Sequence, residues 1–532
     1  MEPVSLGVSV IALFAECIRA YKVFSTASYL GSDLSIVKTK FQIEETRFVQ
    51  WGIYWGYATD PSKCILEYTI INAGQNVAST VRLTLMQVST LLKEYDTVST
   101  KYDSHHRSPA YRGIVWALKD KERLETIVRH LNDFNDGLHQ LLPKQKEQSL
   151  TQSVACTMVS SHDGADLDNI IMAMASMQFS DATKLARFKK AYQMMALGHE
   201  QDLSSSSPLS SPLELDPGRL QFSNRYTSPE RVFGSLDGSH RILVEWKPYD
   251  PSTVTGGATA RVLLRHRASH LAELMSSRSQ RPVNFNILTC AGYFDQIENQ
   301  RFGFVYQLPP AVLQHMPFTL QELLSPTHVP DLGTRFHLAV SLAKSLNTLH
   351  TSGWLHKSIR SNNIAIFQTV GTNAPDFQMP YLVGFSFSRP DAFGEETFHE
   401  RSATASVNQL YRHPEVQGLH PRRYQASDDV YSFGLVLLEI ALWKPLAVIQ
   451  GRNYGDAQQL GLDRKQVLAA VASLPRKIGV IYTEAVEKCL NLTPSKAAPE
   501  LTHSAPEWNA ERLRKQNAFY WDVVRKLEDC RA

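Results

Sequence analysis

Apolar residues recur at three- and four-residue steps through the first 200 residues of this 532-residue chain. Such spacing places the apolar side chains on one face of a helix. Four stripes of this kind lie at 34–55, 77–92, 114–141 and 185–195. Several amphipathic helices joined by short connections predict an all-α bundle whose core is made of these stripes. Asp33 and Asp166 are the expected N-caps of two of its helices.

The pattern changes after a serine- and proline-rich segment at 204–212, whose composition predicts a linker with little capacity to pack. Beyond it, strand-like runs at 241–246 and 302–307 precede helical stretches that dominate from about Gly333. An Asp237-Gly238 pair between apolar runs predicts a hairpin turn. We therefore expect a multidomain chain. Its parts are an all-α bundle at 1–200, a linker at 201–225 and an α+β bilobal domain at 226–532, with a β-rich lobe before a larger helical lobe.

The first apolar run, at 4–14, is too short for a membrane span, which needs about twenty apolar residues. Charged residues begin again at Glu16, and no positive segment precedes the run, which argues against a signal peptide. The default prediction is a buried or half-buried helix. The alternative is a helix that moves from the bundle into a bilayer, with Leu13 and Phe14 on the inserting face.

The composition limits the class of protein and the kinds of partner and site that it can have. A hydrophobic content of 43% and a charged content of 20% indicate globular domains with sizeable cores. A net charge of +3 without a basic run argues against nucleic acid as the main partner. The six cysteines lack Cys-x-x-Cys spacing and predict neither a disulfide framework nor a zinc site. We expect a cytoplasmic protein without a metal or a required cofactor, whose partners are other proteins or further copies of itself.

The segment 355–364 has the sequence LHKSIRSNNI. It resembles the protein-kinase catalytic loop, His-Arg-Asp-Leu-Lys-x-x-Asn, in which the Asp accepts the substrate proton and the Asn holds a metal ion. His356, Arg360 and Asn363 stand at matching positions, but Ser358 replaces the Asp. A neutral hydroxyl cannot act as this base unaided. The resemblance therefore implies a kinase fold that has lost its catalytic base.

Three later segments continue the resemblance. Phe385 matches the Phe of Asp-Phe-Gly, but Gly384 replaces the metal-binding Asp and offers no ligand. The HPE sequence that ends at Glu415 resembles Ala-Pro-Glu, although the arginine that usually pairs with this glutamate cannot be placed. The run 428–434 resembles the Asp-Val-Trp-Ser-Phe-Gly start of the large buried helix. The resemblance implies structural roles for His356, Phe385, Glu415 and Asp429.

Nucleotide binding is a weaker match. Lys247, at the end of a predicted strand, is the candidate for the phosphate-pairing lysine, and Glu273 is the candidate for its helix partner. No Gly-x-Gly-x-x-Gly precedes Lys247, and a lysine that ends a strand is also typical of a solvated edge. Three interpretations stay open: a structural pseudokinase, ATP binding through Lys247 and Asn363, and an atypical kinase in which another acid, such as Asp391, replaces a missing group. The loss of both a base and a metal ligand disfavours the third, so no catalytic residue is assigned.

The sequences RGIVWALKDK at 112–121 and LNDFNDGL at 131–138, with the element Arg47-x-x-x-Trp51-Gly52, identify a second resemblance. They resemble the fungal HeLo domain, the globular domain of the HET-s/HET-S prion-incompatibility proteins. The resemblance covers about the first 200 residues and implies a helical bundle. In toxic members of that family, the N-terminal segment is expelled and inserts into membranes, which kills the cell.

The combined arrangement is similar to the animal mixed-lineage kinase-like effector of necroptosis, in which a pseudokinase restrains a membrane-attacking bundle. It implies a signalling or heterokaryon-incompatibility, cell-death-type effector that associates with membranes when activated. The alternatives are an atypical ATP-binding protein kinase and a non-enzymatic adaptor that only binds other proteins.

Overall fold

The computed structural model describes most of the chain in separate stretches. They are residues 9–25, 35–99, 121–202, 213–227, 230–249, 258–276, 281–282, 284–309, 317–326, 329–371, 374–391, 410–417, 422–451, 462–491 and 505–532. The chain divides into two compact units, Met1–Arg187 and Phe188–Ala532. The division falls inside helix α9 (Ser180–Asp202), ahead of the predicted linker at 201–225, of which residues 203–212 lie outside the described part.

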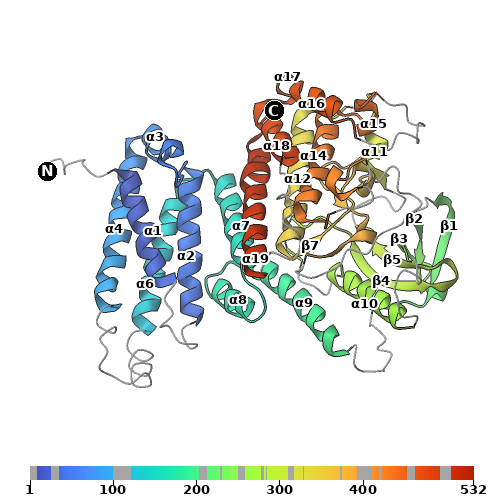
Figure 1. The fold of residues 1–532 in the computed structure, drawn as a ribbon, viewed down its shortest axis with the longest axis horizontal. Helices are drawn as coiled ribbons and strands as arrows, with labels where there is room; N and C mark the ends of the chain where they lie inside the picture. Colours follow the sequence, from blue (N-terminus) through green and yellow to red (C-terminus); the bar gives the residue numbers. More distant parts are fainter. Residues whose placement is uncertain are drawn as a thin grey trace. The chain divides into compact units, whose positions relative to one another are not determined.

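The first unit is a bundle of helices (Figure 1). Its helices are α1 (Val10–Ser25), α2 (Ser35–Tyr54), α3 (Leu66–Asn72), α4 (Gln75–Ser99), α6 (Lys121–Gln140), α7 (Lys144–Ser160), α8 (Asp166–Ser176) and the start of α9. Helices α1, α2, α4 and α6 lie side by side, with α1 packed on both α2 and α4. The apolar stripe predicted for α2 faces the core, where Phe41, Phe48 and Trp51 are fully buried.

Helix α1 is a core helix of this bundle. Val10 and Phe14 have no exposed surface, and the Phe14 ring stacks on Phe48 with ring centroids 4.5 Å apart. Gly52 leaves the room for this contact, because a Cβ there would lie 2.0 Å from Phe14 Cζ. The prediction of a buried or half-buried helix at 4–14 is confirmed from Val10 onward, while residues 1–8 lie outside the described part. Within the described ranges, no helix has both the length and the apolar character needed to cross a bilayer.

Other details of the bundle differ from the sequence prediction. Asp166 is not an N-cap, since it is the first residue of α8 and Ala165 precedes it as a cap without a side-chain bond. An acidic side chain in a first helical turn is still favourable because it faces the positive end of the helix dipole. Asp33 and the 114–120 part of the third stripe lie outside the described residues. The pattern of apolar residues also did not predict α3, α7 and α8 as separate helices.

The small lobe of the second unit follows the end of α9 and contains an antiparallel five-stranded sheet of order β1-β2-β3-β5-β4. The strands are β1 (Leu220–Thr227), β2 (Arg231–Leu236), β3 (His240–Pro248), β4 (Thr289–Gln296) and β5 (Arg301–Gln307), and helix α10 (Ala258–Leu274) packs against β4. Asp237 and Gly238 have φ values of 52° and 73°. Two successive positive φ angles define the turn type that Asp-Gly favours, so the predicted hairpin is confirmed.

A larger helical lobe follows the sheet. Its main helices are α12 (Leu332–Thr351), α14 (Ala426–Leu442), α16 (Arg464–Ala472), α18 (Val480–Asn491) and α19 (Ala505–Phe519), with short helices α11 (Leu320–Leu323), α15 (Leu446–Ile449), α17 (Pro475–Ile478) and α20 (Arg525–Asp529). Short strands are β6 (Phe318–Thr319), β7 (Trp354–Leu355), β8 (Ile364–Ile366), β9 (Tyr381–Leu382) and β10 (Arg389–Pro390). Every side chain of α14 from Ser427 to Ala441 is buried, and α12 and α18 pack against it. The chain therefore has the expected class, a helical bundle followed by an α+β bilobal domain.

Candidate functional site

The segment that resembles a catalytic loop follows β7 and is anchored on α14. The buried carboxylate of Asp429 accepts hydrogen bonds from the backbone amides of His356 and Lys357, both at 2.8 Å. Lys357 has a φ of 66°, a conformation rare outside glycine, which turns two successive amides toward one acceptor. Burial alone would raise the pKa of Asp429, but donors led by His350 hold it below its ordinary value. Tyr424 Oη donates to the same carboxylate at 2.8 Å. Asp429 therefore holds the turn at 356–357 against α14.

His356 and Phe385 are also packing residues. Their rings lie 4.6 Å apart, centroid to centroid. The Nδ1 atom of His356 accepts from the Ser358 amide at 3.2 Å, so we assign the proton to Nε2, which donates to the Val383 carbonyl at 3.1 Å. Burial lowers the pKa of His356 to about 4, so the ring is neutral near pH 7. The pair ties the loop to the 383–385 segment.

Glu415 has an arginine partner that the sequence motif did not indicate. Arg422 Nε donates to Glu415 Oε2 at 2.9 Å, and Arg422 also forms a forked pair with both oxygens of Asp428 at 2.6 and 2.8 Å. The partner is only seven residues downstream of Glu415, between it and α14. Arg422 thus connects Glu415 to Asp428 of α14, and the structural role assigned to Glu415 stays a prediction.

The two positions that lost their carboxylates are joined through Asn363. Its Nδ2 donates to the carbonyl and to the hydroxyl of Ser358, at 2.8 and 2.9 Å. Gly384 has a φ of +85°, and a Cβ there would lie 2.3 Å from Asn363 Cγ. The side chain of Asn363 therefore fills the space beside position 384, where a kinase of this family carries its metal-binding Asp.

A buried ion pair lies between this loop and the sheet. Arg231 of β2 and Glu245 of β3 are 5% and 4% exposed, with Arg231 Nε 2.6 Å from Glu245 Oε1. The oxygens of Glu245 also accept from the Gly384 amide at 2.8 and 3.0 Å. Arg231 donates to the Asn362 carbonyl at 2.9 Å and to Asn363 Oδ1. These side chains join the small lobe to both degenerate positions.

A second ion pair crosses between the lobes next to the first. Arg360 is buried, and its Nη2 donates to both oxygens of Glu230 at 2.7 and 2.8 Å. Glu230 immediately precedes β2, so consecutive residues of the small lobe carry a negative and a positive charge to the loop. The sequence analysis did not identify Glu230 or Arg231 as site residues, because neither belongs to a kinase motif.

Two of the three nucleotide-binding candidates, Lys247 and Glu273, lie on the small lobe. Lys247 is the penultimate residue of β3, half-buried and opposite Phe302 of β5. Glu273 is half-buried near the end of α10. The β3 side chain that reaches position 384 is Glu245, two residues before Lys247. The roles assigned to Lys247 and Glu273 stay predictions.

The motif that indicated a HeLo domain forms a polar cluster inside the bundle. Glu44 of α2 is fully buried and accepts from Arg47 Nη1 at 3.1 Å and from Asn135 Nδ2 of α6 at 2.6 Å. Arg47 also pairs with Asp136. Trp51 Nε1 donates to the Leu138 carbonyl at 2.9 Å. The motif residues therefore bind α2 to α6.

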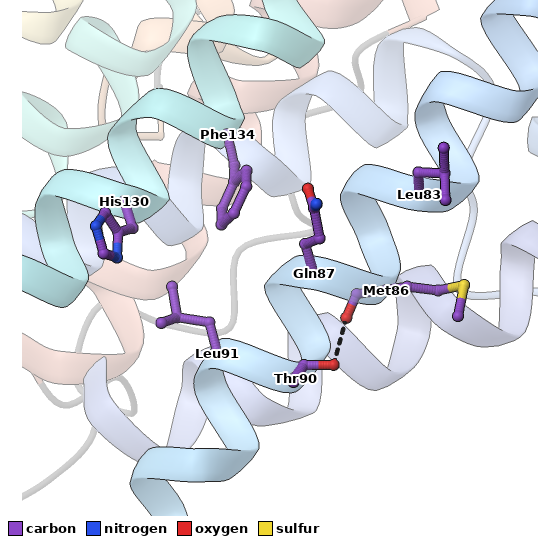
Figure 2. A pocket seen from close by; sticks show the side chains of 7 residues that line it. All are labelled: Leu83, Met86, Gln87, Thr90, Leu91, His130 and Phe134. Atoms are coloured by element: carbon purple, nitrogen blue, oxygen red, sulfur yellow. Dashed lines mark hydrogen bonds between the residues drawn. The ribbon is translucent and has the colours of Figure 1, made fainter.

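A pocket of about 470 Å³ opens on the bundle between α4 and α6 (Figure 2). Its lining is mostly apolar, and Leu83 and Met86 are 62% and 49% exposed. The lining residues are Leu83, Met86, Gln87, Thr90 and Leu91 of α4 with His130 and Phe134 of α6. Neither a carboxylate nor a thiol lies among them. The pocket is an exposed, mostly apolar surface with one histidine in its lining, and among the described residues no group of three or more metal-ligating side chains occurs.

Comparisons with known proteins match both parts of the chain. The HeLo family model, described as prion-inhibition and propagation, matches residues 4–110 and 103–170. A second model, described as a domain of unknown function (DUF7580), matches residues 296–531.

Curated relatives of the second part are protein kinases. A probable inactive receptor kinase of Arabidopsis thaliana is 35% identical over 112 residues, 21% of this chain and 14% of its own length. The dual specificity testis-specific protein kinase 1 of Homo sapiens is 27% identical over 201 residues, 37% of this chain and 29% of its own. A probable receptor-like protein kinase of Arabidopsis thaliana is 28% identical over 317 residues, 56% of this chain and 31% of its own. The chain thus spans less than a third of each relative. It carries an N-terminal HeLo domain and a C-terminal protein-kinase-like domain.

Proposed function

We propose that this protein is a cell-death-type signalling effector in which a pseudokinase domain restrains a membrane-acting HeLo bundle. A HeLo domain joined to a kinase-like domain supports incompatibility-type signalling in general. One observation carries the finer proposal. The kinase-like domain keeps the framework around Asp429 and His356, while Ser358 and Gly384 replace the base and the metal ligand. A fold kept without its chemistry fits regulation better than phosphate transfer.

In this proposal the resting protein is cytoplasmic, and α1 is held in the bundle core. Activation removes the restraint, the bundle oligomerises, and α1 with the residues before it enters a bilayer. Lipid then buries the apolar side chains that the core has released. Glu16, Arg19 and Lys22 oppose insertion unless they line a pore.

The test uses the full chain with a protease site placed in the 204–212 linker. We expect no dye release from liposomes by the intact protein and release after cleavage in the linker. A chain with a scrambled, uncleavable site treated with the same protease is the control. Failure of the cleaved protein to release dye would remove the membrane step and favour the adaptor.

A cross-link tests whether α1 has to leave the bundle. Leu13 and Phe14 are buried, so glutamate there would unfold the bundle and would not test insertion. Glu16 of α1 and Lys93 of α4 form an ion pair with side chains 31% and 64% exposed, which makes them accessible to a thiol reagent once both are cysteine. A short bis-maleimide joining the two cysteines should abolish release, and the unlinked double variant should keep it. Equal release by both would refute the movement of α1.

A further inference from the structure

The residues that would receive a metal–nucleotide complex are already engaged by charges of the protein itself. In kinases the loop Asn holds a metal ion, but here Asn363 Oδ1 accepts from the guanidinium of Arg231. Position 384 has no carboxylate, and its amide donates to Glu245. Mg²⁺ needs oxygen ligands, and at Asn363 it would instead meet a cation. The residues present do not fit a magnesium ion.

The phosphate groups of the nucleotide would also find their binding position taken, because a carboxylate of the protein occupies it. Arg360 Nη2 donates to both carboxylate oxygens of Glu230, at 2.7 and 2.8 Å. A guanidinium binds carboxylate and phosphate oxygens through the same set of donors. Because Glu230 engages this arginine of the loop, a phosphate group would have to displace a carboxylate of the same chain.

We propose that Glu230 and Arg231 form a built-in substitute for a phosphate–metal pair, which closes the cleft and excludes Mg-ATP. We call Glu230, Arg231, Glu245 and Arg360 the charge latch. The two glutamates and two arginines balance in charge, and all but Glu230 are less than 10% exposed. Separation of the lobes would leave the buried guanidinium of Arg360 without its carboxylate partner. It would also remove the Arg231–Glu245 pair from its hydrogen bonds to Asn363 and Gly384, so opening is disfavoured. The inference does not depend on the membrane proposal.

The proposal predicts two latent ion sites that substitution would unmask. Without the Arg231 side chain, the Glu245 carboxylate, the Asn362 carbonyl and Asn363 Oδ1 remain as oxygen groups that shared one partner. Oxygen donors of these types are the ligands of hard divalent cations. Without the Glu230 carboxylate, Arg360 remains as a guanidinium that phosphate oxygens can reach. Each variant should therefore respond to a different ion.

The experiment measures hydrogen exchange and thermal unfolding of the full chain, as wild type, Glu230→Ala and Arg231→Ala. Each protein is tested alone, with Mn²⁺ or Mg²⁺, with inorganic pyrophosphate and with Mg-ATP. We expect several-fold faster exchange of peptides from 355–364 in both variants. Divalent cations should restore protection in Arg231→Ala only, and pyrophosphate should restore it in Glu230→Ala only. Wild type should respond to none of these ligands.

The matched control is Arg219→Ala. It breaks an exposed arginine–carboxylate pair with Asp237 in the same lobe, away from the cleft, and should respond to neither ion. Protection or a raised Tm of wild type with Mg-ATP would overturn the latch, as would ligand responses in the variants no larger than those of the control. If an alanine variant does not fold, Glu230→Gln and Arg231→Lys replace it. Unchanged exchange at 355–364 in both conservative variants would also overturn the proposal.

Discussion

The fully buried carboxylate of Glu44 holds the polar cluster of the HeLo bundle together, and replacing it by Gln tests how much the bundle depends on it. The substitution keeps the size of the side chain and removes its charge. Arg47, which is 5% exposed, would then keep only the half-exposed carboxylate of Asp136 as an anionic partner within the cluster. Asn132 and Asn135, whose amides donate to Glu44 at 3.0 and 2.6 Å, would each face a neutral amide.

The expected loss is large for one substitution. Breaking a buried ion pair by removing one partner costs about 3–5 kcal/mol, because the remaining charge stays out of water without compensation. Asp136 retains part of the compensation, so we expect about 3 kcal/mol for Glu44→Gln. A domain of this kind has about 5–15 kcal/mol of stability in total, so the loss should be obvious. Adding Arg47→Met should recover part of it, because the uncompensated charge is then gone.

The assay is urea unfolding of the full chain, followed by hydrogen exchange in peptides of α2 and α6, which separates the bundle from the kinase-like domain. The control is Lys63→Ala, which removes an exposed pair with Asp60 whose two charged atoms lie 3.5 Å apart. Such exposed pairs contribute about 0–1 kcal/mol. The reasoning is refuted if Glu44→Gln costs no more than this control, or if the double variant is as unstable as Glu44→Gln alone.

Three further outcomes are expected. The double change Ser358→Asp with Gly384→Asp should give no more phosphate transfer from γ-labelled ATP than wild type, because Asn363 fills the space at position 384. Asp429→Ala should destabilise the kinase-like domain by about 3 kcal/mol in urea unfolding, since several buried donors lose one acceptor. His356 has a pKa near 4 when folded against an ordinary 6.5, so the unfolded chain takes up its proton first as the pH falls. The free energy of unfolding should therefore be lower at pH 4.5 than at pH 7, by about 2–3 kcal/mol from this group. His356→Phe should reduce this loss.

Features that depend on near neighbours in the chain could be predicted from the sequence. The stripe of α2 repeats over several turns, so its buried face was correct, and Phe41, Phe48 and Trp51 are in the core. The Asp237-Gly238 turn was correct because two adjacent residues determine its backbone geometry. Asp166 was misplaced by one residue, since a cap and a first-turn acid have the same local sequence signal.

The charge latch could not be predicted in this way. Arg231 and Asn363 lie 132 positions apart, and no periodicity relates residues at that separation. Within the sequence, Glu245 is one polar residue in a β-strand, and only the register of β3 with β5 and the fold of the loop bring it to Gly384. The motif comparison directed attention to Lys247 because lysine is the residue type that kinases use, while the contact at position 384 is made by an acid.

The burial of α1 in the bundle core limits how this helix could insert into a membrane. Five large apolar side chains of α1 are buried there: Val10, Leu13, Phe14, Tyr21 and Phe24. At about 1.5–3 kcal/mol each, exposing them to water would cost roughly 8–15 kcal/mol, which equals the whole stability of a typical domain. Helix α1 therefore cannot leave the bundle at equilibrium before another apolar surface is present. Removal of the restraint alone should leave the bundle intact in solution, and the release of α1 should require lipid or further copies of the bundle at the moment of exit.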